Sequence, residues 1–314
     1  MKKLTLILCM LAGINKLSAQ QLTLKNGEVF AIETRNIVKA QFTSDDQYTF
    51  QFKVISSNSA EYKLQCTLLK ARTELNSSNR KIKLSSDSIR KTVFNSTAVL
   101  TPGILLAESF TIVLSPKCKL IRFEGTDELI QRAITRWHIA AGVQKYIKPN
   151  LDDFLTAVVK SMFFELPNQR IGYQSTWTNA DKISYEVITI RGQFLDITAV
   201  SADKTMHAKY TLNEVNGLLT DANIASQYNM AKGLQHVDYS QAMVENATAS
   251  VVDTAWLNMA ITMSTMSDAF INNAGDINSA AVLAYLKNHD ELYKNDAYYL
   301  GRKRYLKQKL KIYD

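Results

Sequence analysis

The side chains best suited to acid–base chemistry near neutral pH are histidines, and this chain has four: His138, His207, His236 and His289. No two of them stand four residues apart, the spacing that lets one helix hold a metal ion between two imidazoles. No serine lies in a nucleophile-elbow sequence, although folding can also assemble a Ser–His–Asp site from distant segments. We therefore predict a protein that is not an enzyme and uses no metal or cofactor. A hydrolase with a spatially assembled site is kept as an alternative.

Two pairs of neighbouring carboxylates, Asp45-Asp46 and Asp152-Asp153, could serve acid–base catalysis or calcium binding. Asp45 and Asp46 fall in a segment with the pattern of a strand, where adjacent side chains point to opposite faces. Asp152 and Asp153 follow Pro149 and suit the acidic first turn of a helix. Both pairs are therefore interpreted as structural.

Two cysteines, Cys66 and Cys118, lie in the body of the chain. In an oxidising compartment they could form a disulfide, which would contribute ~4 kcal/mol in the chain-entropy account. Cys66 alternates with Leu64 and Leu68 on the apolar side of a predicted strand, whereas Cys118 lies in the predicted turn 115–119. The alternatives are a disulfide, or a buried Cys66 with an exposed Cys118 thiol.

An apolar ligand is the other candidate for a site. Trp256, Met259 and Met263 are the residues that we predict to contact such a ligand, because methionine adapts to varied apolar shapes. Ordinary core packing is the alternative interpretation of these three residues.

The C-terminal segment 287–314 holds eight basic residues. A helix there could contact an anionic membrane surface or an acidic partner. The residues predicted to make that contact are Arg302, Lys303, Arg304, Lys307 and Lys311. The alternative is a terminal helix that packs on its own domain and leaves its basic face in water.

The overall composition is that of a folded globular protein, with 46% hydrophobic and 21% charged residues. Lys and Arg total 37 against 29 Asp and Glu, a net charge of +8. Three of the lysines lie in the N-terminal leader, so the remaining charge is too weak to argue for nucleic acid as a partner.

Residues 1–19 have the pattern of a cleaved signal peptide. Lys2 and Lys3 precede an apolar run that is too short for a permanent anchor, and Ala19 offers a small residue for cleavage. No later run approaches ~18 apolar residues, so no transmembrane span is predicted. We expect an exported protein that remains in the periplasm or leaves the cell.

Strand-like and helix-like regions then alternate along the chain. Residues 20–125 form a first predicted β region, in which Asn26-Gly27 suggests a hairpin turn between 22–25 and 28–32. Residues 126–166 carry a helical period and predict two helices, one starting at Thr126 and one restarting at Pro149-Asn150.

The second predicted β region spans residues 167–272, with Arg191-Gly192 as a hairpin turn. Within it, 249–266 fits either a strand or a helix, and its Val and Thr content favours a strand. Residues 273–314 are predicted as a basic helical tail. The fold class is therefore α+β, mainly an antiparallel β-sheet with two central helices and a helical C-terminal tail.

Three segments carry a resemblance: the early Leu22-x-Leu-Lys-x-Gly27 pattern, the turn 114–121, and Glu165-Leu-Pro167 followed by Gly172 and Trp177. They resemble an uncharacterised family, a domain of unknown function, of exported bacterial β-rich proteins. The resemblance covers about residues 22–230 and brings no catalytic residues, and the family more usually has glycine at position 118. The architecture is also similar to that of periplasmic lipoprotein and lipid carriers.

These observations predict a non-enzymatic exported envelope protein that binds an apolar ligand or a protein partner across its sheet. Its partner would be a lipid or another envelope protein. The alternatives are an interaction module held at the membrane surface by its basic tail, and the hydrolase considered above.

Overall fold

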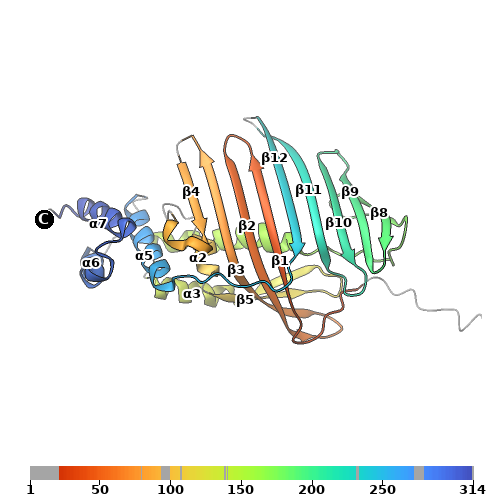
Figure 1. Cartoon of the computed structure of the whole chain (residues 1–314), viewed down its shortest axis with the longest axis horizontal. Helices are drawn as coiled ribbons and strands as arrows, with labels where there is room; N and C mark the ends of the chain where they lie inside the picture. Colours follow the sequence, from red (N-terminus) through yellow and green to blue (C-terminus); the bar gives the residue numbers. More distant parts are fainter. Residues whose placement is uncertain are drawn as a thin grey trace, which may run out of the picture.

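A computed structural model describes residues 21–312 apart from 79, 93–99, 107, 138, 140, 231–232 and 272–278. The predicted signal peptide and His138 lie outside the described residues. The described part is a mainly antiparallel β-sheet with helices along one face and at one end (Figure 1). The predicted α+β class with a helical C-terminal tail is confirmed.

The two predicted β regions share one twelve-stranded sheet in the described part of the chain. The strands of the first region run outward from the centre of the sheet, and those of the second run inward from its far edge. Central strands β1 and β12 pair antiparallel and join the two halves, in the order β6-β5-β3-β2-β1-β12-β11-β10-β9-β8-β7, with β4 on β3.

The bounds of the strands follow the alternation of apolar and polar residues. The first half comprises β1 Val29–Lys39, β2 Thr43–Ser57, β3 Tyr62–Ser77, β4 Arg80–Ser85, β5 Ser109–Leu114 and β6 Leu120–Glu124. The second half comprises β7 Thr176–Thr178, β8 Ile183–Arg191, β9 Phe194–Ser201, β10 Met206–Asn213, β11 Leu219–Met230 and β12 Gly233–Met243. The predicted turn at Arg191-Gly192 joins β8 to β9, and Gly192 has the positive φ of +61° that such a turn requires.

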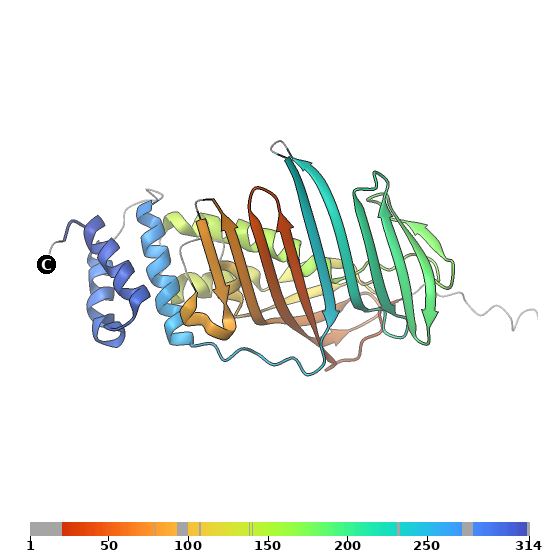
Figure 2. The same ribbon diagram turned by 45° about the horizontal axis from the view of Figure 1, so that its top comes forward.

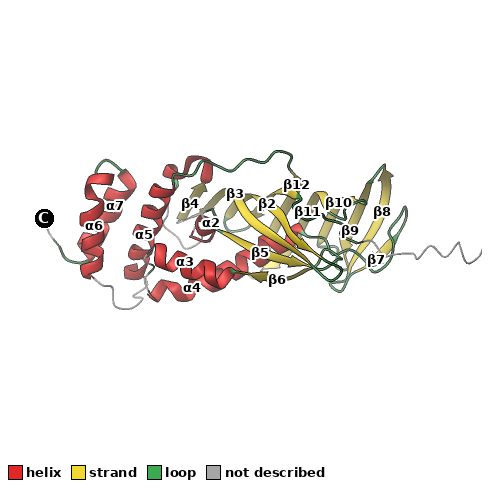
Figure 3. Cartoon of the chain, turned by 90° about the horizontal axis from the view of Figure 1, so that it is seen from below, coloured by secondary structure: helices red, strands yellow, loops and turns green. Residues whose placement is uncertain are grey.

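Two helices between the strand regions cover one face of the sheet (Figure 3). They are α3 Thr126–Arg136 and α4 Ala141–Phe154, and α4 continues through the single turns η3 Leu155–Val159 and η4 Lys160–Met162. The predicted restart at Pro149-Asn150 is wrong, because Pro149 lies inside α4. Burial of Ile147, Leu151 and Leu155 on both sides of this proline favours a continuous helix despite the missing N–H.

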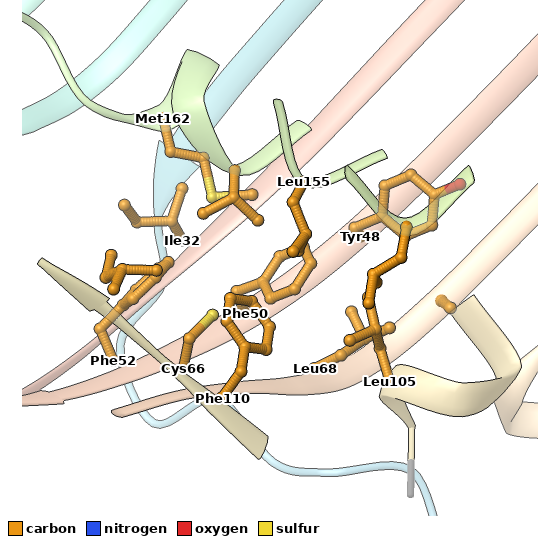
Figure 4. Packing of buried hydrophobic residues seen from close by; sticks show 14 of the residues in the cluster. Ile32, Tyr48, Phe50, Phe52, Cys66, Leu68, Leu105, Phe110, Leu155 and Met162 are labelled. Atoms are coloured by element: carbon orange, nitrogen blue, oxygen red, sulfur yellow. The ribbon is translucent and has the colours of Figure 1, made fainter. Parts of the chain in front are cut away.

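The core lies between these helices and the sheet. Phe50, Phe52, Cys66 and Leu155 have no more than 1% of their surface exposed, and Figure 4 shows their side chains packed together. The Phe52 ring meets the Phe163 ring edge-on, with centroids 5.3 Å apart. Large side chains therefore fill the helix-covered face of the sheet.

A segment predicted as a strand is a helix. Residues Thr254–Ile271 form α5, which is followed by α6 Ser279–Tyr293 and α7 Ala297–Lys309 beyond the β4 end of the sheet (Figure 2). Asp253 accepts a hydrogen bond from the Trp256 backbone N–H at 3.0 Å and so caps α5. The segment lacks a clear helical stripe because α5 is buried on several sides, by the body of the protein and by α7.

The predicted hairpin at Asn26-Gly27 is only half present. Gly27 turns with a φ of +83°, but residues 22–25 do not pair with β1. Instead, Leu22 N donates to Pro116 O at 2.6 Å and Thr23 N donates to Asn216 O at 2.9 Å. Two consecutive residues thus connect the β5–β6 turn to the β10–β11 turn, which belong to opposite halves of the sheet.

A strap, residues 244–253, leads from β12 to α5 across the lower end of the helix-free face (Figure 1). Val244 N donates to Ala31 O and Ser250 N donates to Leu69 O, each at 3.0 Å. Arg90 forms an ion pair with Asp253 at the end of the strap. Within the described residues, no helix is long and apolar enough to cross a membrane.

Candidate functional site

The face of the sheet opposite α3 and α4 is hollowed in three places. The upper hollow, about 560 Å³, lies over β9, β10, β11, β12 and β1. The lower hollow, about 1010 Å³, lies between the strap and the lower ends of β1, β2, β10 and β11. A third, about 410 Å³, lies over β7–β9 and shares Thr198, Ala199 and Val200 with the upper hollow. The upper and third hollows are therefore adjacent on the helix-free face.

Two rows of side chains form the upper hollow, and the pairing register of five strands sets their order. The first row runs Ile37, Asp238, Ala225, His207, Val200. The second row runs Arg35, Ser240, Asn223, Lys209, Thr198. Small side chains in the middle of both rows leave the space, and the larger groups stand around it.

Charged side chains of both signs line the upper hollow. Arg35 donates two hydrogen bonds to Asp45, at 2.9 and 2.8 Å, so its charge is largely engaged. Lys209 and His207 lie two residues apart on β10 and point to the same face. In the described part of the chain, neither has an ion-pair partner. Among the residues that the structure describes, Asp238 is the single carboxylate that lines this hollow.

The side chains of Asp45 and Asp46 lie on opposite faces of β2, as expected for neighbouring residues of a strand. Asp45 lies on the helix-free face, where its ion pair with Arg35 lowers the pKa of the Asp45 carboxyl. Burial raises the pKa of the Asp46 carboxyl on the covered face, where Ser44 donates to it at 2.6 Å. Asp152 and Asp153 lie inside α4 rather than in its first turn, because the helix begins at Ala141.

The described histidines do not come together. His207 lines the upper hollow, and His236 lies on β12. His289 lies on α6, where its ring stacks on Tyr285 with centroids 4.0 Å apart. Among the described residues, no group of three His, Cys, Asp or Glu side chains could hold a metal ion.

The predicted apolar contact residues lie deep between helices. Trp256, Met259 and Met263 of α5 have at most 1% of their surface exposed. Trp256 Nε1 donates to Asp296 Oδ2 at 2.8 Å, and its ring packs against Tyr298. None of the three lines the hollows described above. Contact with a ligand stays a prediction for these residues, and Trp256 joins α5 to the start of α7.

The basic residues of the tail face several directions. Lys303 forms an ion pair with Asp290 at 2.7 Å, and the Arg302 guanidinium lies over the Tyr298 ring. Tyr299 and Leu306 on the same helix are fully buried. Arg304 is exposed, as is Lys311, which lies just after α7. The helix therefore packs on its own chain, and contact of Arg302, Lys303, Arg304, Lys307 and Lys311 with a membrane or partner stays a prediction.

Cys66 and Cys118 are both buried and are not bridged. The expected exposure of Cys118 is wrong, because its turn packs under residues 163–166 and the Phe164 N–H donates to its sulfur. Burial raises the pKa of the Cys118 thiol to about 12 and also raises that of Cys66. Cys118 has a φ of +62°, a conformation that favours glycine.

Sequence reasoning did not identify the residues of the upper hollow. They come from β1 and from β9–β12, which are far apart in the chain and meet through the β1–β12 pairing. The available signal was the run of small or polar residues at alternate positions of these strands, such as Thr198, Ala225 and Ser240.

Comparisons with known proteins were made for sequence and structure. Residues 59–267, about two thirds of the chain, match a family whose description is "Family of unknown function (DUF6263)". The predicted resemblance to an uncharacterised family is thereby confirmed. A comparison with curated protein sequences found no match.

Solved structures gave distant similarities. A lipovitellin structure described by its lipid–protein interactions has a TM-score of 0.38 and 7% identity over 92% of this chain, which spans 36% of the lipovitellin chain. A putative outer membrane lipoprotein-sorting protein domain from Vibrio parahaemolyticus has a TM-score of 0.18 and 8% identity, covering 74% of this chain and 93% of that one. A DUF1329 family protein from Desulfovibrio piger has a TM-score of 0.19 and 7% identity, covering 74% and 90%. Scores this low say nothing about a ligand.

Proposed function

The chain belongs to the DUF6263 family of unknown function, and from its own surfaces we propose that it is a non-enzymatic binding protein. Its ligand is a small amphipathic molecule with an apolar body and an anionic head, such as a fatty acid. The binding site is the upper hollow on the helix-free face. The signal-peptide pattern of residues 1–19 supports a place of action outside the cytoplasm.

The observation that carries this proposal is the contrast between a filled face and a hollowed one. Aromatic and aliphatic side chains from α4 and the sheet occupy the covered face, as the contact between Tyr48 and Phe154 shows. On the other face, the upper hollow has about 560 Å³, within the ~300–1,000 Å³ range of small-molecule sites.

The lining of the hollow indicates the chemistry of the ligand. Ile37, Ala225 and Val200 offer apolar surface in the first row. Lys209 stands beside them with an unpaired ammonium group within the described part of the chain, and it can bind a carboxylate or phosphate. An anionic head on Lys209 would place the apolar body of the ligand over Ala225.

A fluorescent fatty acid tests the proposal. Ala225→Trp fills the floor of the hollow and should reduce affinity at least tenfold in a fluorescence titration. Thr67→Trp is the matched control, because Thr67, on β3, lies on the same face of the sheet as Ala225 and outside the hollows. Equal binding by the two variants, or no binding by the parent protein, would overturn the proposal.

The head-group contact has its own pair of variants. Lys209→Gln should weaken binding of the fatty acid several-fold and leave binding of the matched fatty alcohol unchanged. Lys53→Gln removes an exposed lysine from the same face outside the hollows and should change neither. Native mass spectrometry of gently extracted protein would report a co-purifying ligand, and a bound protein instead would assign the face to a protein partner.

A further inference from the structure

The β11–β12 hairpin projects beyond the strands on both sides of it (Figure 1). Its ladder continues to the pair Met230–Gly233, whereas pairing with β10 ends at Ser226 and pairing with β1 ends at His236. Residues 227–230 and 233–235, here called the projecting ribbon, therefore extend about 13 Å past the sheet, at ~3.3 Å per residue.

The projecting ribbon carries apolar side chains on both of its faces. Tyr228 and Met230 point to one face, with 48% and 58% of their surface exposed. Leu234 points to the other face and is 46% exposed. Phe42, in the neighbouring β1–β2 turn, is also exposed. Several exposed apolar groups near the tip of one hairpin are typical of surfaces that contact a partner or a membrane.

Lysines lie on both sides of the ribbon's base. Lys39 pairs with His236 on the β1 side. Lys204 lies in the β9–β10 turn on the other side, where Thr205 O accepts a hydrogen bond from Gln227 N at 2.8 Å. Asp203 shares that turn, and hydroxyl and backbone donors from Ser201 and Thr205 lower its pKa to about 2. Two lysines against one carboxylate give the base of the ribbon a positive balance.

We propose that the projecting ribbon inserts its apolar side chains into the surface of an anionic phospholipid bilayer. Aliphatic and tyrosine side chains suit the boundary between head groups and acyl chains, and flanking lysines bind anionic head groups. The ribbon is also continuous with the upper hollow, since Leu234 and Asp238 lie on the same face of β12. A ligand taken from a bilayer would thus have a short path along that face.

Vesicle flotation tests the ribbon directly. The purified protein should float with vesicles of phosphatidylcholine and phosphatidylglycerol at 7:3 and much less with phosphatidylcholine alone. The triple variant Tyr228→Ser, Met230→Ser, Leu234→Ser should lose at least tenfold in binding. Its matched control removes three exposed leucines at the helical end, Leu283→Ser, Leu292→Ser and Leu300→Ser, and should bind normally. Unchanged binding by the ribbon variant, or no binding by the parent protein, would overturn the proposal.

A dye on the ribbon gives a second measurement that does not depend on loss of binding. Cys66 and Cys118, the two cysteines that follow the predicted signal peptide, are buried, so a Met230→Cys thiol in the mature protein can be labelled selectively with an environment-sensitive fluorophore. Its emission should shift to the blue with the anionic vesicles, and the same dye on Leu292→Cys should not respond. No shift at position 230 would overturn the proposal. A response to a purified envelope protein without one to vesicles would do so too.

The proposal for the ribbon and the proposal for the hollow can be tested separately. Ala225→Trp should reduce the affinity for the soluble fatty acid at least tenfold and leave vesicle flotation unchanged. The triple ribbon variant should show the reverse.

Discussion

The two faces of the sheet are built from the same strands and differ in what occupies them. Along β2, Phe50 and Phe52 point toward α4, while Gln51 and Lys53 point away from it. Along β12, Gln241 bonds to η4 on the covered side, and Asp238 and Ser240 line the upper hollow on the other. One face thus supplies stability from within the chain. The other keeps small and polar groups around open space, and for that reason we assign binding to it.

The largest difference between the faces should be in stability. Phe52→Ala removes a fully buried ring that contacts Phe30 and Phe163, with centroids 5.3 Å away in each case. We expect a loss of about 3–5 kcal/mol in the free energy of unfolding, measured by urea titration. Lys53→Ala, the next residue on the opposite face, should cost less than about 0.5 kcal/mol. Similar losses would contradict the proposed division between the faces.

A polar contact on the covered face should have an intermediate effect. Gln241 is buried, donates to Met162 O at 3.1 Å and accepts from the Tyr239 hydroxyl at 2.9 Å. Gln241→Met keeps the length of the side chain and removes both hydrogen bonds, leaving the Met162 carbonyl without its side-chain donor, so we expect a loss of about 1–3 kcal/mol. Gln65→Met removes an exposed bond to Ser109 on the other face and should change little. Thermal and chemical unfolding would compare the two.

The neighbouring carboxylates Asp45 and Asp46 lie on opposite faces, so their contributions to stability should depend on pH in opposite ways. Burial raises the folded pKa of Asp46 above its unfolded value, so folding favours the protonated acid. The cost of burying the ionised Asp46 carboxylate, which lowers the free energy of unfolding, is therefore absent in acid. This cost is complete once the pH has risen through the folded pKa. Asp46→Asn should therefore stabilise the protein by about 0.5–1 kcal/mol at pH 7, and the gain should disappear at low pH. A gain that persists in acid would have another cause.

Asp45 should behave in the opposite way and to a smaller extent. Its ion pair with the exposed Arg35 lowers its folded pKa, so its contribution is present above the unfolded pKa and is lost as the pH falls through the folded one. Asp45→Asn should cost about 0.2–1 kcal/mol at pH 7 and nothing in acid, and high salt should reduce the cost. Unfolding titrations at two pH values and two salt concentrations would check this.

Much of the fold could be predicted from local patterns. The period-two alternation located β2 and β3, and the acidic residues after Thr126 located the start of α3. Gly125, however, occupies the cap position rather than Thr126, and no side chain caps this helix. Prediction failed where tertiary contacts decide. Pro149 remains helical because its neighbours are buried, and α5 lacks a one-sided stripe because it is enclosed.

The candidate site depends still more on long-range contacts. Cys118 is buried because a distant segment, residues 163–166, packs on its turn. The rows of the upper hollow exist only through the pairing of Ile37 with Asp238 and of Asp238 with Ala225. No local pattern contains that register, so residue types alone could not identify these side chains as one site.

The hydrogen bonds of Leu22 and Thr23 also bear on the order in which the chain folds. Leu22 has its acceptor at Pro116, but Thr23 must wait until Asn216 has been translated. Contacts of such separation are slow to form because a long loop must close first. The start of the chain therefore reaches its final position late, after the turns that it connects have formed in both halves of the sheet.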